Sequence, residues 1–445
     1  MWYQIFPERF ANGNPNLTPD GAREWDAVIA PNMDDFFGGD LQGIIDHLDY
    51  LKDLGITGLY LCPIFEATTN HKYDTTDYFE IDRHFGDKEV FRNLVEEAHK
   101  RGIKIMLDAV FNHIGYQSAQ WQDVLKNGEK SPYKDWFHIQ EFPVTEDKLQ
   151  NPRQLPYHTF AFASYMPKLN TANPEVRDYL LSVATYWIEN FDIDAWRLDV
   201  ANEIDHQFWK DFRKAVLAKK PDLYILGEIW HTSQPWLQGD EFHAVMNYPL
   251  SESIKDYFLR QRKKTEQFIS EINSQSMYYK QQISEVMFNL LDSHDTERIL
   301  TTAKGNIQHV KAALTFLYLQ KGTPCIYYGT ELALIGGPDP DCRRVMPWDR
   351  VSEDNDMLNF MKKLIKVRKE VASIIQHGNY RLEEVKLDVL SLKWDYQGKE
   401  VQAIFNQSSE KYTLDRDSVD LASHCQFEDG QQVILPDGFV VTISE

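Results

Sequence analysis

The sequence predicts a (β/α)8 barrel with an excursion after its third strand and a small antiparallel β domain at its C-terminal end. Three observations predict this fold class. Short apolar runs alternate with amphipathic helical stretches that often end at a glycine, which is typical of parallel βα units. Eight such runs occur in order. Beyond His377 the helical period gives way to alternating strands and turns.

The predicted barrel strands are short and apolar, and most stop at proline, glycine or a polar residue. They cover residues 2–6, 57–61, 104–110, 193–198, 223–227, 244–247, 287–291 and 324–328. The predicted helices cover residues 40–54, 88–101, 174–191, 205–218, 251–282, 307–320 and 356–375. The C-terminal strands cover residues 380–385, 389–396, 400–406 and 439–444. The 445 residues suffice for a barrel of about 250 residues and an accessory domain.

The periodic pattern disappears between the third strand and the helix that precedes the fourth, where aromatic residues and prolines are frequent. Long loops inside a compact domain are usually functional. We therefore divide the chain into a first barrel part (1–113), an inserted subdomain (114–165), a second barrel part (166–375) and a C-terminal β domain (376–445).

The composition excludes several classes of partner. A net charge of −21 argues against nucleic-acid binding, which needs clustered cations. No stretch of about 18 apolar residues suggests a membrane span. The four cysteines lack CxxC spacing and predict reduced thiols, and no secretory signal is evident. We expect a soluble, cytoplasmic protein whose 13% aromatic content suits the stacking of sugars.

Carboxylates stand at the ends of three predicted strands, namely Asp199, Glu228 and Asp295. Active sites of such barrels lie at the C-terminal ends of the strands. Arg197 and Asp199 are two residues apart, so both side chains face the same space, and the cation favours an ionised Asp199. Each carboxylate alone is more often a helix cap, a surface charge or half of an ion pair. Three that converge indicate a site.

Two carboxyl groups, one ionised and one protonated, are what glycosidic cleavage requires. Glu228 lies between Gly227 and the apolar Ile229 and Trp230, where burial would raise its pKa and suit it to donate a proton. The sequence contains no G-x-S-x-G, Walker, H-E-x-x-H or Rossmann glycine motif that would indicate other chemistry. These residues predict a glycosidase.

Four ordered motifs carry a family resemblance. They are DAVFNH (108–113), WRLDVANEI (196–204), GEIWH (227–231) and LLDSHDTER (290–298). On these motifs the chain is identified as a member of the alpha-amylase family of glycoside hydrolases. MPKLN (166–170), together with ANE (201–203) and GEIWH, resembles the neopullulanase, cyclomaltodextrinase and maltogenic amylase group.

The resemblance implies the catalytic roles. Asp199 would be the nucleophile that forms a β-glucosyl-enzyme intermediate, and Glu228 the acid and then the base. Asp295 would hold the hydroxyl groups of the sugar at the cleavage point, and Arg197 would orient Asp199. The two catalytic carboxyl groups should lie about 5–5.5 Å apart, which gives retention of configuration. A sugar that replaces water as the acceptor would give transglycosylation.

The resemblance also implies the sugar contacts. His113 and His294 would hydrogen-bond the sugar at the cleavage point, and Tyr73 would stack on its face. Asp339 and Arg343 would hold the next sugar outward.

Three further positions follow from the same resemblance. Glu203 and Trp230 would line the leaving-group side, although Trp230 could instead pack in the core. Asp108 would support the catalytic centre. The preferred substrate, its chain length, the balance of α-1,4 against α-1,6 cleavage and the choice between exo and endo action stay open. Two alternatives are a non-catalytic sugar-binding barrel and a transferase or isomerase on the same scaffold.

Calcium is the one metal that the resemblance suggests, and its role would be structural, because the chemistry needs no cofactor. The ligands would be Asn12, Asn14, the Gly38 carbonyl and Asp40. Calcium prefers several carboxylates, yet Asn14 stands where aspartate is usual. The segment NGNPN also fits a plain turn.

Relatives in this group usually carry a β-sandwich before the barrel, and that domain commonly supplies the dimer contact and one wall of the site. Here the predicted barrel starts at residue 2. The oligomeric state therefore stays open, with a monomer as one alternative. The site should be more open or be walled by the excursion, and its partner should be an α-glucan oligosaccharide.

Overall fold

Eight parallel strands form the centre of the computed structural model, which describes residues 1–144, 154–414, 419–428 and 431–444. They are β1 (Trp2–Ile5), β2 (Gly58–Leu61), β5 (Lys104–Ala109), β6 (Ala195–Leu198), β7 (Tyr224–Gly227), β8 (Ala244–Val245), β9 (Phe288–Asn289) and β10 (Thr323–Tyr327). Their order in the sheet is β8-β7-β6-β5-β2-β1-β10-β9. A parallel bridge from Met246 to Phe288 joins the two edge strands and closes the ring. The predicted (β/α)8 barrel is confirmed.

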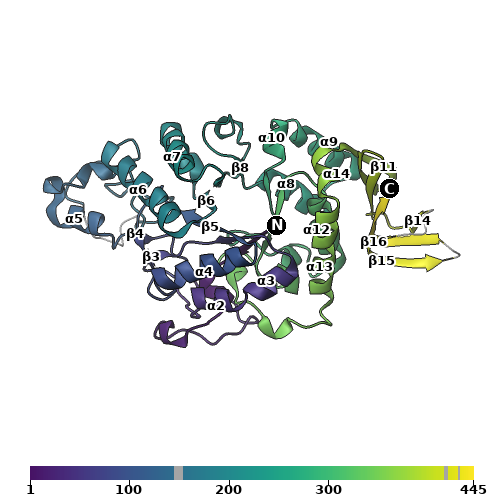
Figure 1. Cartoon of the computed structure of the whole chain (residues 1–445), viewed down its shortest axis with the longest axis horizontal. Helices are drawn as coiled ribbons and strands as arrows, with labels where there is room; N and C mark the ends of the chain where they lie inside the picture. The colour runs from purple at the N-terminus through teal and green to yellow at the C-terminus, as the bar shows by residue number, and fades with distance from the viewer. Residues whose placement is uncertain (145–153, 415–418, 429–430, 445) are drawn as a thin grey trace.

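Helices cover the outside of the barrel (Figure 1). The larger ones are α4 (Lys88–Lys100), α6 (Pro174–Phe191), α7 (His206–Lys219), α9 (Thr265–Ser276), α12 (Ile307–Tyr318) and α13 (Asp356–Glu370), and α14 (Ala372–His377) follows α13. Helix α4 shows why the local sequence folds in this way. The Asp87 side chain accepts hydrogen bonds from the N–H groups of Glu89 and Val90 and so caps the helix. Its buried residues recur at helical spacing, so one face packs against the sheet.

Two predicted helices are interrupted. The stretch predicted as 40–54 divides at His47 into α2 (Leu41–Asp46) and α3 (Leu48–Leu54). The stretch predicted as 251–282 contains α8 (Tyr248–Ile254), a π-helical turn (Lys255–Leu259), α9 and α10 (Gln281–Ser284). Gln261 has a φ of 51°, which a continuing right-handed helix does not allow. The hydrophobic spacing alone did not show these breaks.

The excursion leaves the barrel after β5 and is tied back to it by isolated bridges. It contains α5 (Ala119–Asn127). The bridges pair His113 with Lys168 and Phe137 with Leu169, so the MPKLN segment lies against the excursion. Residues 145–153 of the predicted insertion lie outside the described residues. A further antiparallel pair, β3 (Phe65–Ala67) and β4 (Thr75–Ile81), was not predicted from the sequence.

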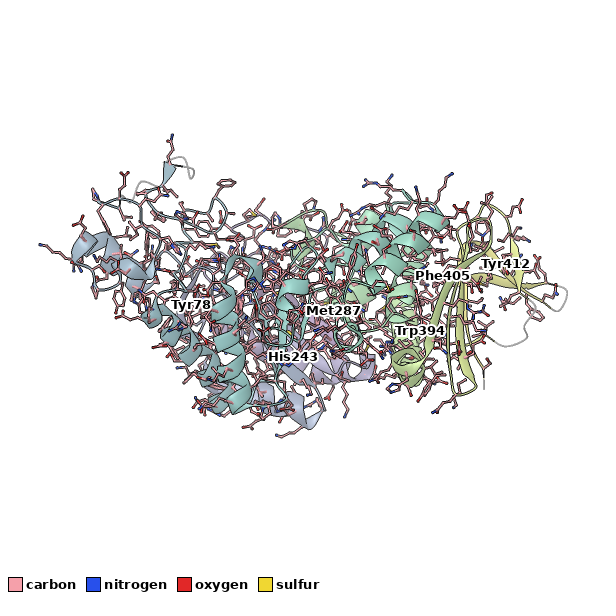
Figure 2. All side chains as sticks on the ribbon, turned by 90° about the horizontal axis from the view of Figure 1, so that it is seen from above. Tyr78, His243, Met287, Trp394, Phe405 and Tyr412 are labelled. Carbon is pink, nitrogen blue, oxygen red and sulfur yellow. The ribbon has the colours of Figure 1, made fainter. Side chains whose placement is uncertain are left out.

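The C-terminal domain is an antiparallel sheet at the opposite end of the molecule from α5 (Figure 1). Its strands are β11 (Asn379–Lys386), β12 (Val389–Tyr396), β13 (Lys399–Asn406), β14 (Tyr412–Leu414), β15 (Leu421–Glu428) and β16 (Gln431–Ser444). Figure 2 shows Trp394 and Phe405 where this sheet meets the barrel. Trp394 Nε1 donates to Leu319 O at 2.8 Å. The sheet is therefore anchored to the barrel far from the strand ends that carry the site. Among the residues described, no helix is long and apolar enough to cross a bilayer.

Candidate active site

A cavity of about 420 Å³ opens at the carboxyl ends of the barrel strands. Ten of the residues predicted for catalysis or sugar binding line it: Tyr73, His113, Asp199, Glu203, Glu228, Trp230, His294, Asp295, Asp339 and Arg343. Arg197 is fully buried and lies directly against Asp199 and Glu228. The structure thus brings together side chains that are spread over 270 positions of the chain, from Tyr73 to Arg343.

The two catalytic candidates follow neighbouring strands in register. Leu198 of β6 lies opposite Gly227 of β7, so Asp199 and Glu228 are the next residues on adjacent strands. Val200 then turns the chain with a φ of 46°, a conformation that β-branched residues rarely adopt. Through this turn the Val200 N–H donates to Glu228 Oε2 at 2.9 Å. Sequence reasoning gave Val200 no role, because backbone strain leaves no signal in the residue pattern.

One guanidinium contacts three carboxyl groups. Arg197 Nη1 donates to Asp199 Oδ1 at 2.7 Å and to Asp108 Oδ1 at 2.8 Å. Arg197 Nη2 forms an ion pair with Glu228 Oε2 at 2.9 Å. The Arg197 side chain has no solvent exposure, so these contacts act in a region of low dielectric. Arg197 therefore holds the two catalytic candidates side by side, and Asp108 supports it from β5.

The pKa of Asp199 is shifted by more groups than the sequence-based expectation included. We expected Arg197 to keep Asp199 ionised in the free protein. Burial instead raises the pKa of Asp199 well above its usual range, Arg197 lowers it, and nearby Glu228 and Asp108 raise it further. Burial also raises the pKa of Asp108 to about 6. The expectation gave the effect of Arg197 correctly, since this cation lowers the pKa of Asp199, but it left out burial, which acts more strongly in the opposite direction.

Trp230 lies at the surface beside Glu228. Its side chain is 47% exposed and stacks on Tyr248 with ring centroids 3.8 Å apart. Its Nε1 donates to Glu228 Oε1 at 3.1 Å. The alternative of core packing is therefore excluded. Glu228 accepts a hydrogen bond on each oxygen, one from an indole and one from the Val200 backbone, so its orientation is set from two sides.

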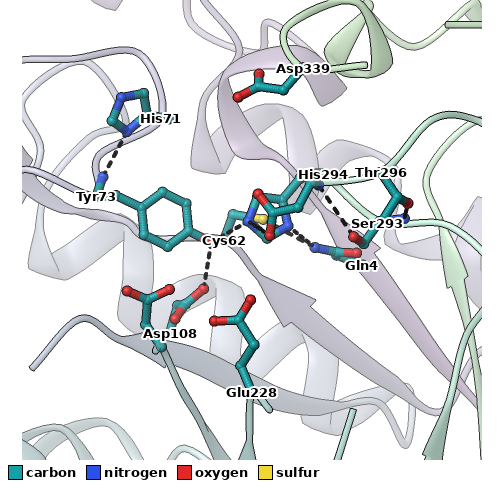
Figure 3. Close-up of polar contacts among 12 residues, drawn as sticks. Gln4, Cys62, His71, Tyr73, Asp108, Glu228, Ser293, His294, Thr296 and Asp339 are labelled. Atoms are coloured by element: carbon teal, nitrogen blue, oxygen red, sulfur yellow. Dashed lines mark hydrogen bonds and ion pairs between the residues drawn. The ribbon is translucent and has the colours of Figure 1, made fainter. Parts of the chain in front are cut away.

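A stacked pair of rings forms another wall of the cavity. The rings of Tyr73 and His294 are nearly parallel, with centroids 5.3 Å apart. His294 Nε2 lies 2.6 Å from the Tyr73 hydroxyl and 3.1 Å from Asp295 Oδ2. Tyr73 in turn donates to Asp108 Oδ2 at 2.9 Å, as Figure 3 shows. Burial lowers the pKa of His294 well below its usual range, so the imidazole is neutral.

His113 is held between the barrel and the excursion. Its Nε2 donates to Tyr73 O at 3.0 Å, and its ring stacks on Phe160 with centroids 5.0 Å apart. Burial lowers the pKa of His113 to about 3, so this ring is neutral too. Residues of the cavity wall that had no predicted role are Met33, His71, Phe160, Ala163, Tyr165, Met166, Val200 and Asn202. Four of them belong to the aromatic-rich segment 160–166, and that composition was the available signal.

The residues predicted to contact sugars farther from the cleavage point also lie at the cavity. Arg343 Nη1 pairs with Asp339 Oδ1 at 2.9 Å, and Arg343 Nε donates to His294 O at 2.8 Å. On the other side, Lys168 Nζ pairs with Glu203 Oε2 at 2.8 Å. Asp339 and Arg343 thus border the buried histidine, whereas Glu203 joins the two group-specific motifs MPKLN and ANE.

The residues suggested for calcium are engaged in hydrogen bonds. Asp40 caps α2, and its two oxygens accept from the N–H groups of Gly13, Asn14 and Gly43. Asn14 Oδ1 accepts from Asn16 N at 3.2 Å. The described residues include no group of three or more His, Cys, Asp or Glu side chains arranged to hold a metal. As arranged here, the segment forms a hydrogen-bonded turn and a helix cap, and calcium binding by it stays a prediction.

Fold and site together indicate a glycoside hydrolase, with Asp199 and Glu228 as its candidate carboxyl pair. The profile of the alpha-amylase catalytic domain matches residues 4–367. The chain is 55% identical over 411 residues to an intracellular maltogenic amylase of Bacillus subtilis, a match that covers 92% of this chain and 68% of the relative. It is 57% identical to a cyclomaltodextrinase of Geobacillus thermopakistaniensis, over 84% of this chain and 63% of that protein. The chain belongs to the alpha-amylase family.

A solved structure is similar over almost the full length of both chains. It is the cyclic alpha-maltosyl-(1→6)-maltose hydrolase of Arthrobacter globiformis, with a TM-score of 0.91 and 38% identity. The match covers 100% of this chain and 98% of that one. The arrangement of barrel, excursion and C-terminal sheet is thus shared with a solved member of the family.

Proposed function

We propose that this chain hydrolyses α-1,4-glucosidic bonds in maltodextrins and related α-glucans, including cyclodextrins and pullulan, with retention of configuration. The observation that carries the proposal is the single guanidinium of Arg197, which holds Asp199 and Glu228 together in the cavity at the strand ends. The relatives named as maltogenic amylase, cyclomaltodextrinase and neopullulanase support the choice of substrates. α-1,6 bonds are a further candidate target, in line with the Arthrobacter hydrolase.

In the first step, Asp199 attacks the anomeric carbon while Glu228 gives its proton to the departing glycosidic oxygen. The bond to the leaving sugar breaks, and a covalent ester forms between the glucosyl group and Asp199. In the second step, Glu228 takes a proton from water, the water oxygen attacks the same carbon, and the Asp199 carboxylate is released. Two inversions give retention, and a sugar in place of water gives transfer.

The free site and the reacting site require different proton positions. Attack needs an ionised Asp199, while burial raises the pKa of this residue in the free protein. The transition state carries positive charge on the sugar, and that charge favours the ionised form of a neighbouring carboxyl group. The mechanism therefore requires an ionised Asp199 and a proton on Glu228 when the glycosidic bond breaks. Asp295, which lies beside His294, would hold the hydroxyl groups of the same sugar.

Two other functions predict different properties of this site. A non-catalytic sugar-binding barrel would need no carboxyl pair, whereas here both members and Asp295 line the cavity. A transferase or isomerase would use the same first step. The exposed face of Trp230 and the nearby Glu203 are where an acceptor would enter, so we expect some transfer beside hydrolysis.

Product analysis tests the proposal. The purified chain is incubated with β-cyclodextrin, pullulan and maltotriose, and the products are separated by chromatography. Proton NMR during the first minutes reads the anomeric configuration. We expect shorter maltooligosaccharides that first appear in the α-configuration. Tight binding without products would favour the sugar-binding barrel, and products longer than the substrate from dilute maltotetraose would favour the transferase.

For the cellular setting, we propose a cytoplasmic enzyme whose partner is its α-glucan substrate. The Bacillus subtilis relative is named as intracellular, and Cys62, Cys325, Cys342 and Cys425 are all free thiols. Light scattering on the purified chain distinguishes a monomer from a dimer.

A further inference from the structure

We propose that Gln4 is a positioning residue whose amide N–H donates to His294 Nδ1 and thereby holds the imidazole as a neutral donor through Nε2. The inference rests on the proposed function, in which His294 contacts the sugar at the cleavage point. Gln4 belongs to β1, is buried, and had no role in the sequence analysis. Its Nε2 lies 2.7 Å from His294 Nδ1 and 3.4 Å from Cys62 Sγ. Figure 3 shows Gln4 and Tyr73 on opposite sides of His294.

The two neighbours of His294 Nε2, on the side of the ring away from Gln4, determine where the imidazole proton lies. The Tyr73 hydroxyl has one proton and donates it to Asp108 Oδ2 at 2.9 Å. Its oxygen must therefore accept from His294 Nε2, which is 2.6 Å away. Asp295 Oδ2 lies 3.1 Å from the same nitrogen, and an ionised carboxylate can only accept. Two independent neighbours thus place the proton on Nε2.

The lone pair on Nδ1, the ring nitrogen that faces Gln4, then determines how the Gln4 amide is oriented. In a neutral imidazole with a proton on Nε2, Nδ1 carries a lone pair and needs a donor. Gln4 must therefore present its NH₂ group, rather than its oxygen, to His294, and the second hydrogen can point to Cys62 Sγ. With the amide in this orientation, a proton on Nδ1 would place two donors 2.7 Å apart, and the imidazolium ion would require the amide to turn its NH₂ group away from Nδ1.

Other charged groups around His294 act in both directions. Burial disfavours a charged imidazole most strongly, and Arg343 and Arg197 act in the same sense. Glu228 favours the charged form. The carboxylates of Asp295, beside Nε2, and of Asp108, beyond Tyr73, act in that sense too. Because these charges act in opposite directions, the hydrogen bond from Gln4 to Nδ1 adds a contact that favours the neutral imidazole with its proton on Nε2.

A neutral donor suits the proposed chemistry. The sugar gains positive charge in the transition state of glycoside hydrolysis. An imidazolium at position 294 would oppose that charge, while a neutral Nε2–H can hydrogen-bond a hydroxyl group without doing so. Gln4 thus acts on the reaction through His294 and does not itself touch the substrate.

The test measures the histidine directly. The protein is labelled with ¹⁵N-histidine, and the ring signals of His294, assigned with a His294→Gln variant, are followed from about pH 5 to pH 8. We expect the wild type to show a neutral ring with its proton on Nε2 throughout. In Gln4→Met, which lacks the donor, His294 should take up a proton at higher pH. In Gln4→Glu, whose carboxylate accepts from Nδ1–H, it should stay protonated to still higher pH.

The kinetics should follow the same order. For Gln4→Met we expect kcat/KM at neutral pH to fall about tenfold, which corresponds to one hydrogen bond, with most of the loss in kcat. The acid limb of its pH profile should move to higher pH, and that of Gln4→Glu should move further. The matched control is Cys62→Ala, which removes the other neighbour of the amide and should leave the tautomer and the acid limb in place.

Two results would overturn the proposal. A wild-type His294 with its proton on Nδ1, or with two protons, contradicts it without any variant and without substrate. A Gln4→Met protein that loses activity while its His294 signals and acid limb stay unchanged shows that Gln4 only packs. Because the ring signals are read in the free protein, they stay informative even if no α-glucan is hydrolysed.

Discussion

The two sides of the cavity differ in burial. On the inner side, the side chains of Arg197 and His294 are 0% and 1% exposed, and their polar atoms meet partners from several strands. On the leaving-group side, Trp230 is 47% exposed and the Glu203 side chain 40%. Packing and charge together hold the side chains of the inner side in place, so we expect few substitutions to be tolerated there. The outer side is partly open to solvent, so we expect substitutions there to have smaller effects.

The largest effect should come from the inner side, at the nucleophile. Asp199→Asn keeps the shape of the side chain but removes the group that attacks the sugar. We expect hydrolysis of maltotriose to fall about 10⁴-fold or more, measured as the initial rate of glucose release. Asp240→Asn, which changes a half-exposed partner of Lys210, is the control and should keep full activity. An Asp199→Asn protein with ordinary activity would remove Asp199 from the mechanism.

The next effect concerns the cation shared by three carboxyl groups. Arg197→Met should destabilise the fold by about 3–5 kcal/mol, because buried carboxyl groups lose their counter-charge. Urea unfolding measures the loss. The comparison is Arg177→Met, whose 3.7 Å pair with Asp211 is partly exposed and should matter by about 1 kcal/mol or less. Equal losses in both variants would contradict the contrast between buried and exposed charge.

The pH dependence of stability sharpens the same contrast. Burial raises the pKa of Asp199, and that of Asp108 to about 6, above the ordinary aspartate value of 3.8. At these two groups the folded protein binds more protons than the unfolded chain above about pH 4, so their contribution to stability falls as the pH rises through this window. Asp199→Asn removes one of these groups. Its Tm should exceed that of the wild type at pH 7, and the difference should shrink toward pH 4.

Calorimetry between pH 4 and pH 7 checks whether Asp199→Asn raises or lowers Tm. Asp240→Asn again serves as control, because the hydrogen bond from Lys210 lowers the pKa of this exposed residue. Its Tm at pH 7 should not rise. An Asp199→Asn protein that is less stable than the wild type at pH 7 would mean that the hydrogen bond to Arg197 outweighs burial.

A smaller effect is expected on the leaving-group side. Trp230→Phe keeps an aromatic ring above Tyr248 but loses the hydrogen bond to Glu228 Oε1. We expect kcat/KM for maltotriose to fall about three- to tenfold, and the ratio of transfer to hydrolysis products to change. The exposed Tyr278→Phe, remote from the cavity, is the control. A loss as large as that of Asp199→Asn would contradict the division between the two sides.

The smallest effect should follow removal of calcium. Because Asp40 already accepts three backbone hydrogen bonds, we expect chelation with EDTA to change neither Tm nor activity. A scan with added calcium, read against one with added magnesium, completes the measurement. A rise in Tm with calcium alone would show that the segment rearranges to bind it.

Much of the fold could be predicted from local patterns. The spacing of apolar residues and the caps at Asp87 and Gly55 depend on neighbours within one or two turns, and they located most barrel strands and helices. The breaks at His47 and Gln261 did not follow, since they depend on backbone angles that the hydrophobic spacing does not record. The three-residue β14 and the eight-residue β15 were missed, and each pairs in this sheet with β16.

The sequence by itself determined which side chains stand at the strand ends, because register and strand order follow from the repeated βα unit. Only the tertiary structure decided their electrostatics. Asp199 is buried and shares Arg197 with Asp108 and Glu228, so its pKa is raised although a cation stands two residues away in the sequence. The tertiary structure also placed the indole of Trp230 at the surface and Gln4 beside His294. Charge and hydrogen bonding depend on every group within a few ångströms, and most of those groups come from distant parts of the chain.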